Sequence, residues 1–400
     1  MSTIINARSP YYIKSISNPS DQGANEDLFK VIYSIFIYSG HVTNDKPTTA
    51  TYTVTKFVKE TTDNFVVIEI SELIRDYLET EYYTEAVDAV WVFISAVRED
   101  DSGATLNAPG GGTTDEQTYL AFDGYGEFEE GINPRTSNDP TNSAGFTPMV
   151  LQTNTCIPFV RGRDIKIPIF SEPLPQATTT VTDAVWNFTD EFWDVEDSNW
   201  NDSDDSLPTP TTDANESSDK IYYLQITTDN AVTGDTITIT STSGNSQSVT
   251  LTLNEVCHPK YEAYRAIYYN KFGALQSFWL PTKHTIKTNT KSKDYKSVTV
   301  EATKTTGPSY SLYKHSNKRF QVTAQQSITL NTELLNECLN PAIEQLLTSE
   351  QVWLEDSSLT VRPVILRSQN LTRKTGVNNK ANIQYELNFD FAFDHIQNIR

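Results

Sequence analysis

The feature that most constrains this chain is a period-2 alternation of apolar and polar residues that recurs along the sequence. It is clear in FKVIYSIFIYSG (29–40) and TATYTVTKFV (49–58), and again in KIYYLQITT (220–228), DTITITSTS (235–243) and SVTLTLNEV (248–256). Successive side chains of a strand point to opposite faces, so alternation predicts strands with one covered face. Long helical periodicity is scarce, and turn-forming residues separate the runs. We therefore predict a mainly β, multi-domain protein of sandwiches or barrels with a few short helices.

The 400 residues are enough for two or three hydrophobic cores. We expect an N-terminal β-sandwich over residues 1–172 and an acidic β insertion over 173–256. A C-terminal β domain is expected over 257–400, with a short helical excursion at 331–349.

Two segments carry helix signals. In SELIRDYLET (71–80), Ser71 can cap a helix whose apolar stripe begins at Leu73. In the excursion, Asn331 and Asn340 are the expected N-caps of two short helices, and a proline follows Asn340 at the tolerated first helical position.

The net charge of −21 is unevenly distributed. Residues 1–172 hold 12 basic and 25 acidic side chains, a net of −13, and residues 173–256 hold 1 and 15, a net of −14. Residues 257–400 hold 18 and 12, a net of +6. This asymmetry indicates complementary surfaces, within a subunit or between neighbours, or else a solvated acidic surface that only keeps the protein soluble.

The motifs of enzymes and metal proteins are missing from the sequence. The five histidines stand at neither HExxH nor HxH spacing, no GxSxG is present, and the Gly-rich loop at 101–118 lacks the Lys-Ser/Thr of a phosphate loop. We predict no enzymatic activity, no catalytic residues, no cofactor and no metal. Cys156, Cys257 and Cys338 have no CxxC spacing, so reduced, buried cysteines are expected rather than a disulfide framework or zinc site.

Membrane association is not expected either. The N-terminus, MSTIINARSPYYIK, lacks the apolar core of a signal peptide. No apolar run approaches the roughly 18 residues of a membrane-spanning helix.

A small tandem repeat distinguishes the acidic insertion. Trp186, Trp193 and Trp200 stand seven residues apart in VWNFTDEFWDVEDSNWNDSDDS (185–206). A coiled coil is excluded because one apolar position per heptad is too few. We predict an irregular aromatic and acidic segment that contacts a partner subunit, calcium or a host receptor. DSNWND (197–202) starts like a calcium loop but lacks its glycine and closing glutamate.

Aromatic residues crowd IYYNKFGALQSFWLPTKH (267–284), which reads as strand, tight turn and strand. The turn is expected at Asn-Lys-Phe-Gly (270–273), because asparagine bonds locally and glycine tolerates φ > 0. The flanking aromatics are either core residues or interface anchors, and both alternatives are open. They are Tyr268, Phe272, Phe278 and Trp279.

Residues 283–319 hold nine basic side chains against two acidic ones, with three tyrosines among them. Basic and aromatic residues together are typical of nucleic-acid surfaces. The strongly acidic chain as a whole does not favour specific nucleic-acid binding, and lysines at alternate strand positions usually mark a solvated face.

Several segments resemble structural proteins of tailed bacteriophages, of the kind found in phages of Bacteroidetes and marine hosts. They are INARSPYYIK (5–14), YYNKFGALQSFW (268–279), SITLNTELLNECLNPAIEQLLTSEQVWL (327–354) and LTRKTGVNNKANIQYELNFDFAFD (371–394). The resemblance implies a non-enzymatic component of the virion tail, collar or baseplate, assembled in the host cytoplasm. It also implies a homo-oligomer, ring-shaped around the tail axis, with other tail or collar proteins as partners. The alternative is an adhesion protein of the virion that binds a host receptor or glycan, as aromatic platforms can.

Overall fold

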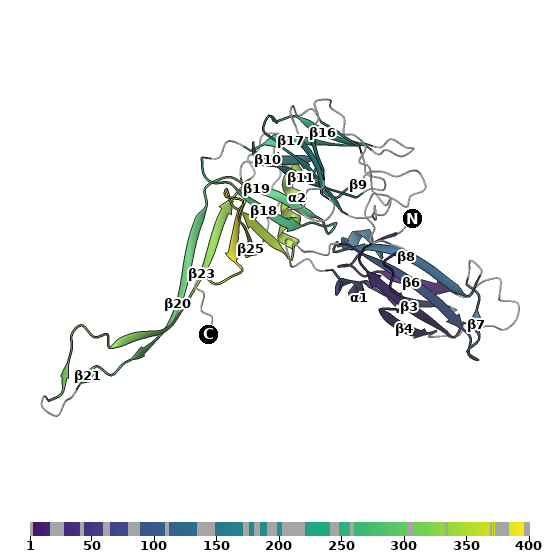
Figure 1. Ribbon diagram of the computed structural model, residues 1–400, viewed down its shortest axis with the longest axis horizontal. Coiled ribbons are helices and arrows are strands. Elements are labelled where there is room, and N and C mark those ends of the chain that lie inside the picture. Colours follow the sequence, from purple (N-terminus) through teal and green to yellow (C-terminus); the bar gives the residue numbers. More distant parts are fainter. Residues whose placement is uncertain are drawn as a thin grey trace. The chain divides into compact units, whose positions relative to one another are not determined.

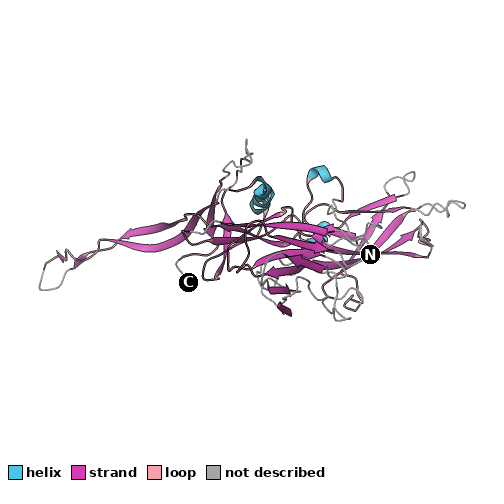
Figure 2. Ribbon diagram, turned by 90° about the horizontal axis from the view of Figure 1, so that it is seen from above, coloured by secondary structure: helices cyan, strands magenta, loops and turns pink. Residues whose placement is uncertain are grey.

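Over the residues that it describes, the computed structural model is mainly β, with several sheets and two short α-helices (Figures 1 and 2). It gives the backbone alone at residues 149, 170, 176–179, 185–189, 198–201, 222, 240 and 248. The segment GVNNK (376–380), which the sequence predicts to be a turn between two strands, lies outside the described residues. In all, it describes residues 3–16, 28–40, 44–58, 65–78, 89–108, 112–133, 149–170, 176–179, 185–189, 198–201, 221–240, 248–256, 260–301, 307–332, 335–368, 370, 372 and 384–395.

The chain divides into two compact units. The first comprises Met1–Cys257, Ile267–Phe278 and Cys338–Glu350, and the second comprises His258–Ala266, Trp279–Glu337 and Gln351–Arg400. The three domains expected from the sequence stay a prediction.

The N-terminal part of the first unit is a six-stranded sheet in the order β1-β8-β6-β3-β4, with β7 paired to β6. A separate ribbon pairs β2 with β5 in antiparallel register. Alternate residues of β3, among them Val31 and Tyr33, share one core with Ile13 of β2 and Ile68 of β5. The alternation predicted for 29–40 is therefore confirmed. The strands are β1 (Thr3–Asn6), β2 (Tyr12–Ile16), β3 (Lys30–Tyr38), β4 (Tyr52–Phe57), β5 (Phe65–Glu69), β6 (Ala89–Glu99), β7 (Thr105–Leu106) and β8 (Thr114–Phe122).

The helix predicted for 71–80 is shorter and begins differently. α1 spans Ser71–Arg75, and Ile70 occupies the cap position, where its carbonyl accepts from the N–H of Ile74. Ser71 is instead the first helical residue, and its N–H and hydroxyl both donate to a carboxylate oxygen of Glu69. The prediction that Ser71 caps the helix was wrong because this carboxylate takes up its hydroxyl.

A second hydrophobic core of the first unit lies between two further sheets. One runs β10-β17-β16-β12 and the other β14-β13-β15-β11-β9. Strands on either side of residue 172 pair with each other: β10 with β17 and β11 with β15. The strands are β9 (Met149–Val150), β10 (Cys156–Phe159), β11 (Ile165–Phe170), β12 (Gln176–Thr179), β13 (Val185–Thr189), β14 (Ser198–Asn201), β15 (Tyr222–Ile226), β16 (Thr236–Thr240) and β17 (Ser248–Glu255).

The C-terminal sheet has seven strands in the order β19-β18-β24-β25-β26-β23-β20. A short antiparallel pair, β21 with β22, lies between β20 and β23 in the sequence. The strands are β18 (Tyr264–Tyr269), β19 (Leu275–Leu280), β20 (Thr285–Lys296), β21 (Val300–Glu301), β22 (Ser309–Tyr310), β23 (Asn317–Asn331), β24 (Val352–Glu355), β25 (Val361–Leu366) and β26 (Glu386–Phe391).

The helical excursion differs from the two capped helices expected. Asn331 is the last residue of β23, and the first helix is a single 3-10 turn, η3 (Glu337–Leu339). α2 follows at Asn340–Thr348 with Leu339 at its cap position and a proline in its first turn. The expected capping roles of Asn331 and Asn340 were wrong, because the strand pairing of β23 extends to Asn331 and the 3-10 turn runs directly into α2. Within the described residues, no helix is long and apolar enough to span a membrane.

Candidate interface: a basic two-stranded arm

The candidate interface is a long hairpin, residues 285–331, which we call the basic arm. β20 pairs with β23 in antiparallel register from Thr285 opposite Thr329 to Lys296 opposite Asn317. On its other side, β23 pairs with β26 only from Ser327 to Asn331. Within the described part of the chain, residues 317–326 of β23 therefore have β20 as their sole strand partner. Figure 1 shows this ribbon running on past the rest of the sheet, with β21 beyond it.

The far half of the arm exposes large apolar side chains. Leu312 is 88% exposed and Tyr313 is 97% exposed. The exposed apolar residues of the arm also include Tyr295, Val298, Val300, Tyr310 and Phe320. A run of exposed apolar side chains of this size on one projecting element is typical of a docking surface.

One face of β20 is basic. Lys287, Lys291 and Lys293 stand at odd-numbered positions of the strand and are all exposed. Their partners on β23 are uncharged, namely Ser327, Thr323 and Gln321. None of these three lysines forms an ion pair with a described residue. Because successive strand residues alternate between faces, the three lysines present an uncompensated positive face.

Charge on the arm is partly compensated nearer its end. Lys314 lies 2.6 Å from Glu301, and Arg319 lies 3.9 Å from Asp294. Lys314 lowers the pKa of the Glu301 carboxyl below its usual value through a hydrogen bond and its charge. Both pairs are solvent-exposed, where ion pairs contribute little to stability.

A second exposed surface lies in the first unit, at residues 127–132, which we call the acidic knuckle. Phe128 is fully exposed and Ile132 is 78% exposed. Glu127, Glu129 and Glu130 surround them, and all three are exposed. The knuckle includes the 3-10 turn η2 (Phe128–Glu130), which is capped by Gly131 at a φ of +77°.

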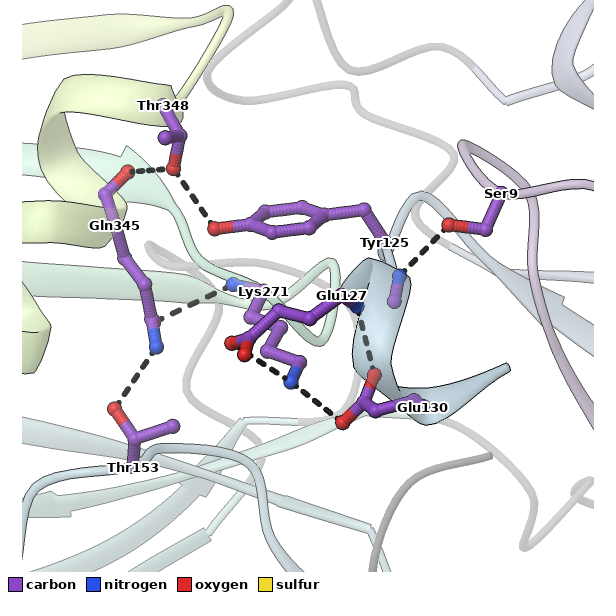
Figure 3. A network of polar contacts seen from close by, with 9 residues as sticks. Ser9, Tyr125, Glu127, Glu130, Thr153, Lys271, Gln345 and Thr348 are labelled. Atoms are coloured by element: carbon purple, nitrogen blue, oxygen red, sulfur yellow. Dashed lines mark hydrogen bonds and ion pairs between the residues drawn. The ribbon is translucent and has the colours of Figure 1, made fainter. Parts of the chain in front are cut away.

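The knuckle is held rigidly from within the first unit (Figure 3). Glu127 and Glu130 form a capping box, in which the Glu127 N–H donates to a Glu130 carboxylate oxygen at 2.8 Å. Lys271 reaches both carboxylates, with Nζ 3.1 Å from Glu127 and 2.7 Å from Glu130. The fully exposed Phe128 is therefore carried by an ordered turn.

Lys271 and Glu130 stabilise each other's charged forms. Partial burial alone would lower the pKa of Lys271, but hydrogen bonds and charges from Glu130 and Glu127 outweigh it and raise that pKa above its ordinary value. Burial would likewise raise the pKa of Glu130, yet the hydrogen bond and charge of Lys271, with a backbone hydrogen bond, hold it below its ordinary value.

Contacts from α2 complete the network of Figure 3. The Tyr125 hydroxyl lies 2.8 Å from the Thr348 hydroxyl, and the Gln345 amide donates to the Thr153 hydroxyl at 2.8 Å. The backbone N–H of Tyr125 donates to the Lys271 carbonyl at 2.8 Å. The predicted turn thus joins three distant parts of the first unit.

The turn predicted at Asn-Lys-Phe-Gly is confirmed. The N–H of Gly273 donates to the Asn270 carbonyl, and Gly273 has φ +76°. Asn270 is fully buried, and its side-chain oxygen accepts from the N–H groups of Phe272 and Ala274 while its amide donates to the Leu151 carbonyl. Local bonding by asparagine and the left-handed glycine are the features that the sequence indicated.

The aromatics flanking this turn lie mostly in the chain's own core. Tyr268, Phe278 and Trp279 are buried, and Phe272 is half-buried. The Tyr268 hydroxyl donates to the Ala342 carbonyl, and burial raises its pKa. This burial favours the core alternative for these three residues over the interface alternative.

Trp279 has a specific partner in the second unit. The Arg265 guanidinium lies 5.5 Å from the centre of the Trp279 ring and pairs with the Glu355 carboxylate, with Nε 3.1 Å from Oε2. All three side chains are buried. Trp279 therefore covers a buried ion pair.

Two of the three repeat tryptophans are brought together by strand pairing. β13 and β14 are antiparallel, and Trp186 stands directly opposite Trp200 in their register. Trp193 lies outside the described residues.

The prediction of reduced cysteines was wrong for two of the three. Cys156 of β10 and Cys338 of η3 form a disulfide, with their Cα atoms 6.2 Å apart and a separation of 182 positions in sequence. The fold brings them together because both segments belong to the first unit. The spacing of the cysteines along the chain did not indicate this disulfide, because a motif such as CxxC detects only cysteines that are close in sequence.

No group of three or more His, Cys, Asp or Glu side chains that could hold a metal ion occurs within the described residues. Asp197 and Asp202, in the segment that starts like a calcium loop, lie outside them. Calcium binding at 197–202 therefore stays an open alternative.

Comparisons with known proteins give no family. No family model matches the chain, and no curated protein matches it. One solved structure with a likeness is a chimeric titin Z1Z2 functionalized with a KLER exogenous peptide from decorin. The identity is 10%, the match covers 64% of this chain and 93% of that chain, and the TM-score is 0.14. A likeness at this TM-score carries no argument about fold or function.

Proposed function

We propose that this protein is a non-enzymatic structural component of a phage virion, working in the tail, collar or baseplate by assembling with further copies of itself. The observation that carries the proposal is the basic arm. An isolated two-stranded ribbon is marginally stable in water, and this one exposes a series of apolar side chains. A partner surface that covers the arm would bury those side chains and stabilise the ribbon.

The assignment to a virion rests on sequence resemblance. The segments that resemble tail proteins include 268–279 and 327–354, which contain the buried turn and α2 of the first unit. The resemblance also supports a ring around the tail axis, with other tail or collar proteins as neighbours.

The first test is the solution mass of the full chain, measured by light scattering over a range of concentrations. An arm-shortened variant, in which an Asn-Gly turn replaces residues 292–322, is the comparison. Lys291 and Thr323 are register partners, so a two-residue turn can close the shortened hairpin between them. We expect an oligomer for the wild-type chain and a monomer for the variant. Equal assembly by both would contradict a role for the arm.

The virion assignment has its own test. We expect mass spectrometry of purified particles of the encoding phage to detect this chain as a stoichiometric component. Particles that lack it would contradict the proposal whatever the solution mass.

The second candidate is an adhesion protein that binds a host receptor or glycan. The register pairing of Trp186 with Trp200 favours it, because tryptophans at opposed strand positions can form an aromatic platform. Deleting residues 186–206 separates the two functions. Normal particles that no longer adsorb to cells favour receptor binding, whereas loss of particle assembly favours the structural role.

A further inference from the structure

We propose that the basic arm of one copy docks on the acidic knuckle of a second copy. This inference rests on the proposed function and names the acceptor that the arm recognises. It requires two surfaces that are exposed, ordered and complementary on the same chain.

The apolar parts of the two surfaces match in kind. The arm exposes Leu312 and Tyr313 almost completely, and the knuckle exposes Phe128 and Ile132. Apolar side chains that stand this far out of the surface gain most when they pack against each other, and aromatic anchors commonly dominate interface energetics. The knuckle is ordered before binding by its capping box and by Lys271, so docking requires little ordering there.

The charges match in sign. Residues 283–319, which contain most of the arm, hold nine basic and two acidic side chains. The knuckle holds three glutamates, two of which pair with the single cation of Lys271. Lys287, Lys291 and Lys293 make no ion pair with the described residues, so their charge is available to a partner. Docking would bring uncompensated lysines toward an acidic surface, which favours association and its rate.

The same charges argue against two other pairings. Arm against arm would bring the lysine faces of two copies together, and like charges in contact disfavour association. Addition of a foreign strand to the outer edge of β20 is disfavoured by its exposed lysines, which are a common protection of edge strands. The acidic chain as a whole favours a second copy over a nucleic acid as the occupant.

Because donor and acceptor are different surfaces, the contact is head-to-tail. Each copy donates one arm and accepts another, and repetition closes into a ring or continues as a filament, depending on the rotation between copies. The two surfaces can therefore be inactivated separately, which gives a decisive mixing experiment.

The experiment uses two full-length backgrounds. The arm-shortened variant keeps the knuckle, and the variant Phe128→Ser/Glu129→Lys keeps the arm. Each alone is expected to remain a monomer, the knuckle variant near the chain mass of 45.0 kDa and the arm-shortened variant below it, because two residues replace residues 292–322. An equimolar mixture is expected to form a complex of two chains and nothing larger, because only one arm and one knuckle remain intact.

The single variant Glu129→Lys is expected to raise the concentration required for assembly about tenfold. Its matched control is Glu72→Lys, the same charge reversal at an exposed position of α1, which should assemble like the wild-type chain. Circular dichroism of every variant checks that the fold is retained.

Four outcomes would overturn the inference. If the knuckle variant assembled to the same extent as the wild-type chain, the arm would dock elsewhere, and the proposed assembly function would be unaffected. An equimolar mixture of the two variants that stays monomeric would also show that the arm docks elsewhere. An arm-dependent complex with a single-stranded oligonucleotide, without self-association, would assign the lysines to nucleic acid. A wild-type chain that is monomeric at every concentration would contradict both this inference and the proposed self-assembly.

Discussion

Gly273 lies directly against the backbone of Asp123, so closely that a Cβ on the glycine would stand 2.8 Å from the Asp123 nitrogen. Gly124, which follows Asp123 in the chain, is equally close to the turn. A Cβ added to Gly124 would lie 2.8 Å from the Lys271 carbonyl oxygen. The turn of β18 and β19 and the segment leading to the acidic knuckle therefore meet backbone to backbone.

We predict that Gly273→Ala lowers the free energy of unfolding by about 2 kcal/mol or more. Two effects add: the left-handed φ of +76° disfavours any Cβ, and the backbone of Asp123 cannot move aside as a flexible side chain could. A urea titration followed by tryptophan fluorescence measures the change.

The matched control for this variant is Gly103→Ala. Gly103 has φ +85°, yet nothing lies within 4 Å of its Cβ position. It shares the backbone strain without the clash, so its loss should be limited to about 1 kcal/mol. Equal losses at both positions would show that close contact contributes nothing at Gly273.

The sequence indicated those parts of the fold that depend on local chemistry. Alternation predicted β3 correctly because one face of that strand is covered by a single core. The turn at Asn270 was predictable because the bonds that close it, from the N–H groups of Phe272 and Ala274 to the Asn270 side-chain oxygen, stay within four residues. Both features follow from period and turn chemistry, which are written in short stretches of sequence.

Long-range relationships were not predictable in the same way. Cys156 and Cys338 are joined by the fold and by nothing in their spacing. Tyr268 is buried with its hydroxyl on the Ala342 carbonyl of α2, which is distant in sequence, so the core and interface alternatives could not be separated. The basic composition of 283–319 and its tyrosines were visible, but the length of the β20–β23 ribbon was not. Nothing in the short stretch around Phe128 indicated that its side chain is fully exposed.

Arg265 and Glu355 give the second prediction. Replacing Arg265 with methionine should lower the free energy of unfolding by about 3–5 kcal/mol, because it leaves the buried Glu355 carboxylate without its cation. It also removes the guanidinium from the Trp279 ring. Thermal denaturation followed by circular dichroism measures the effect.

Arg367→Met is the control for Arg265→Met. Arg367 pairs with Asp390 at 2.8 Å in the same seven-stranded sheet, but its side chain is 54% exposed. An exposed pair contributes about 0–1 kcal/mol. If Arg265→Met lost no more free energy of unfolding than Arg367→Met, burial would not account for the contribution of the Arg265–Glu355 pair.

The disulfide gives the third prediction. Cys156→Ser/Cys338→Ser should lower the free energy of unfolding by about 2–5 kcal/mol, since the bond closes a long loop and restricts the unfolded chain. Intact-mass analysis after alkylation should count two fewer free thiols before reduction than after it. Reducing agent should destabilise the wild-type chain and leave the double variant unchanged.

The Lys271–Glu130 pair gives a pH dependence with a defined sign. The pKa of Glu130 is lowered in the folded protein, so its contribution is present above the ordinary carboxyl value of 4.5 and is lost as pH falls through the folded value. The pKa of Lys271 is raised, so its contribution is present below 10.5 and is lost as pH rises through the folded value. Lys271→Met should therefore destabilise the protein at pH 7 and by less at about pH 3. Unfolding curves of both chains at the two pH values measure this, and an equal difference at both would contradict it.

Salt dependence of assembly is the last prediction. The Debye length falls from about 10 Å at 0.1 M salt to about 3 Å at 1 M, so salt screens charges that meet at a solvent-accessible rim. Assembly through the arm should therefore weaken as NaCl is raised, with the apolar contacts of Leu312 and Tyr313 retaining part of it. The variant Lys287→Ser/Lys291→Ser/Lys293→Ser should assemble more weakly at low salt and respond less to added NaCl. Light scattering of both chains across the salt series measures the two slopes. Wild-type assembly that is unchanged between low and high salt would show that the basic face plays no part, and equal slopes would place the salt-sensitive contact elsewhere on the chain.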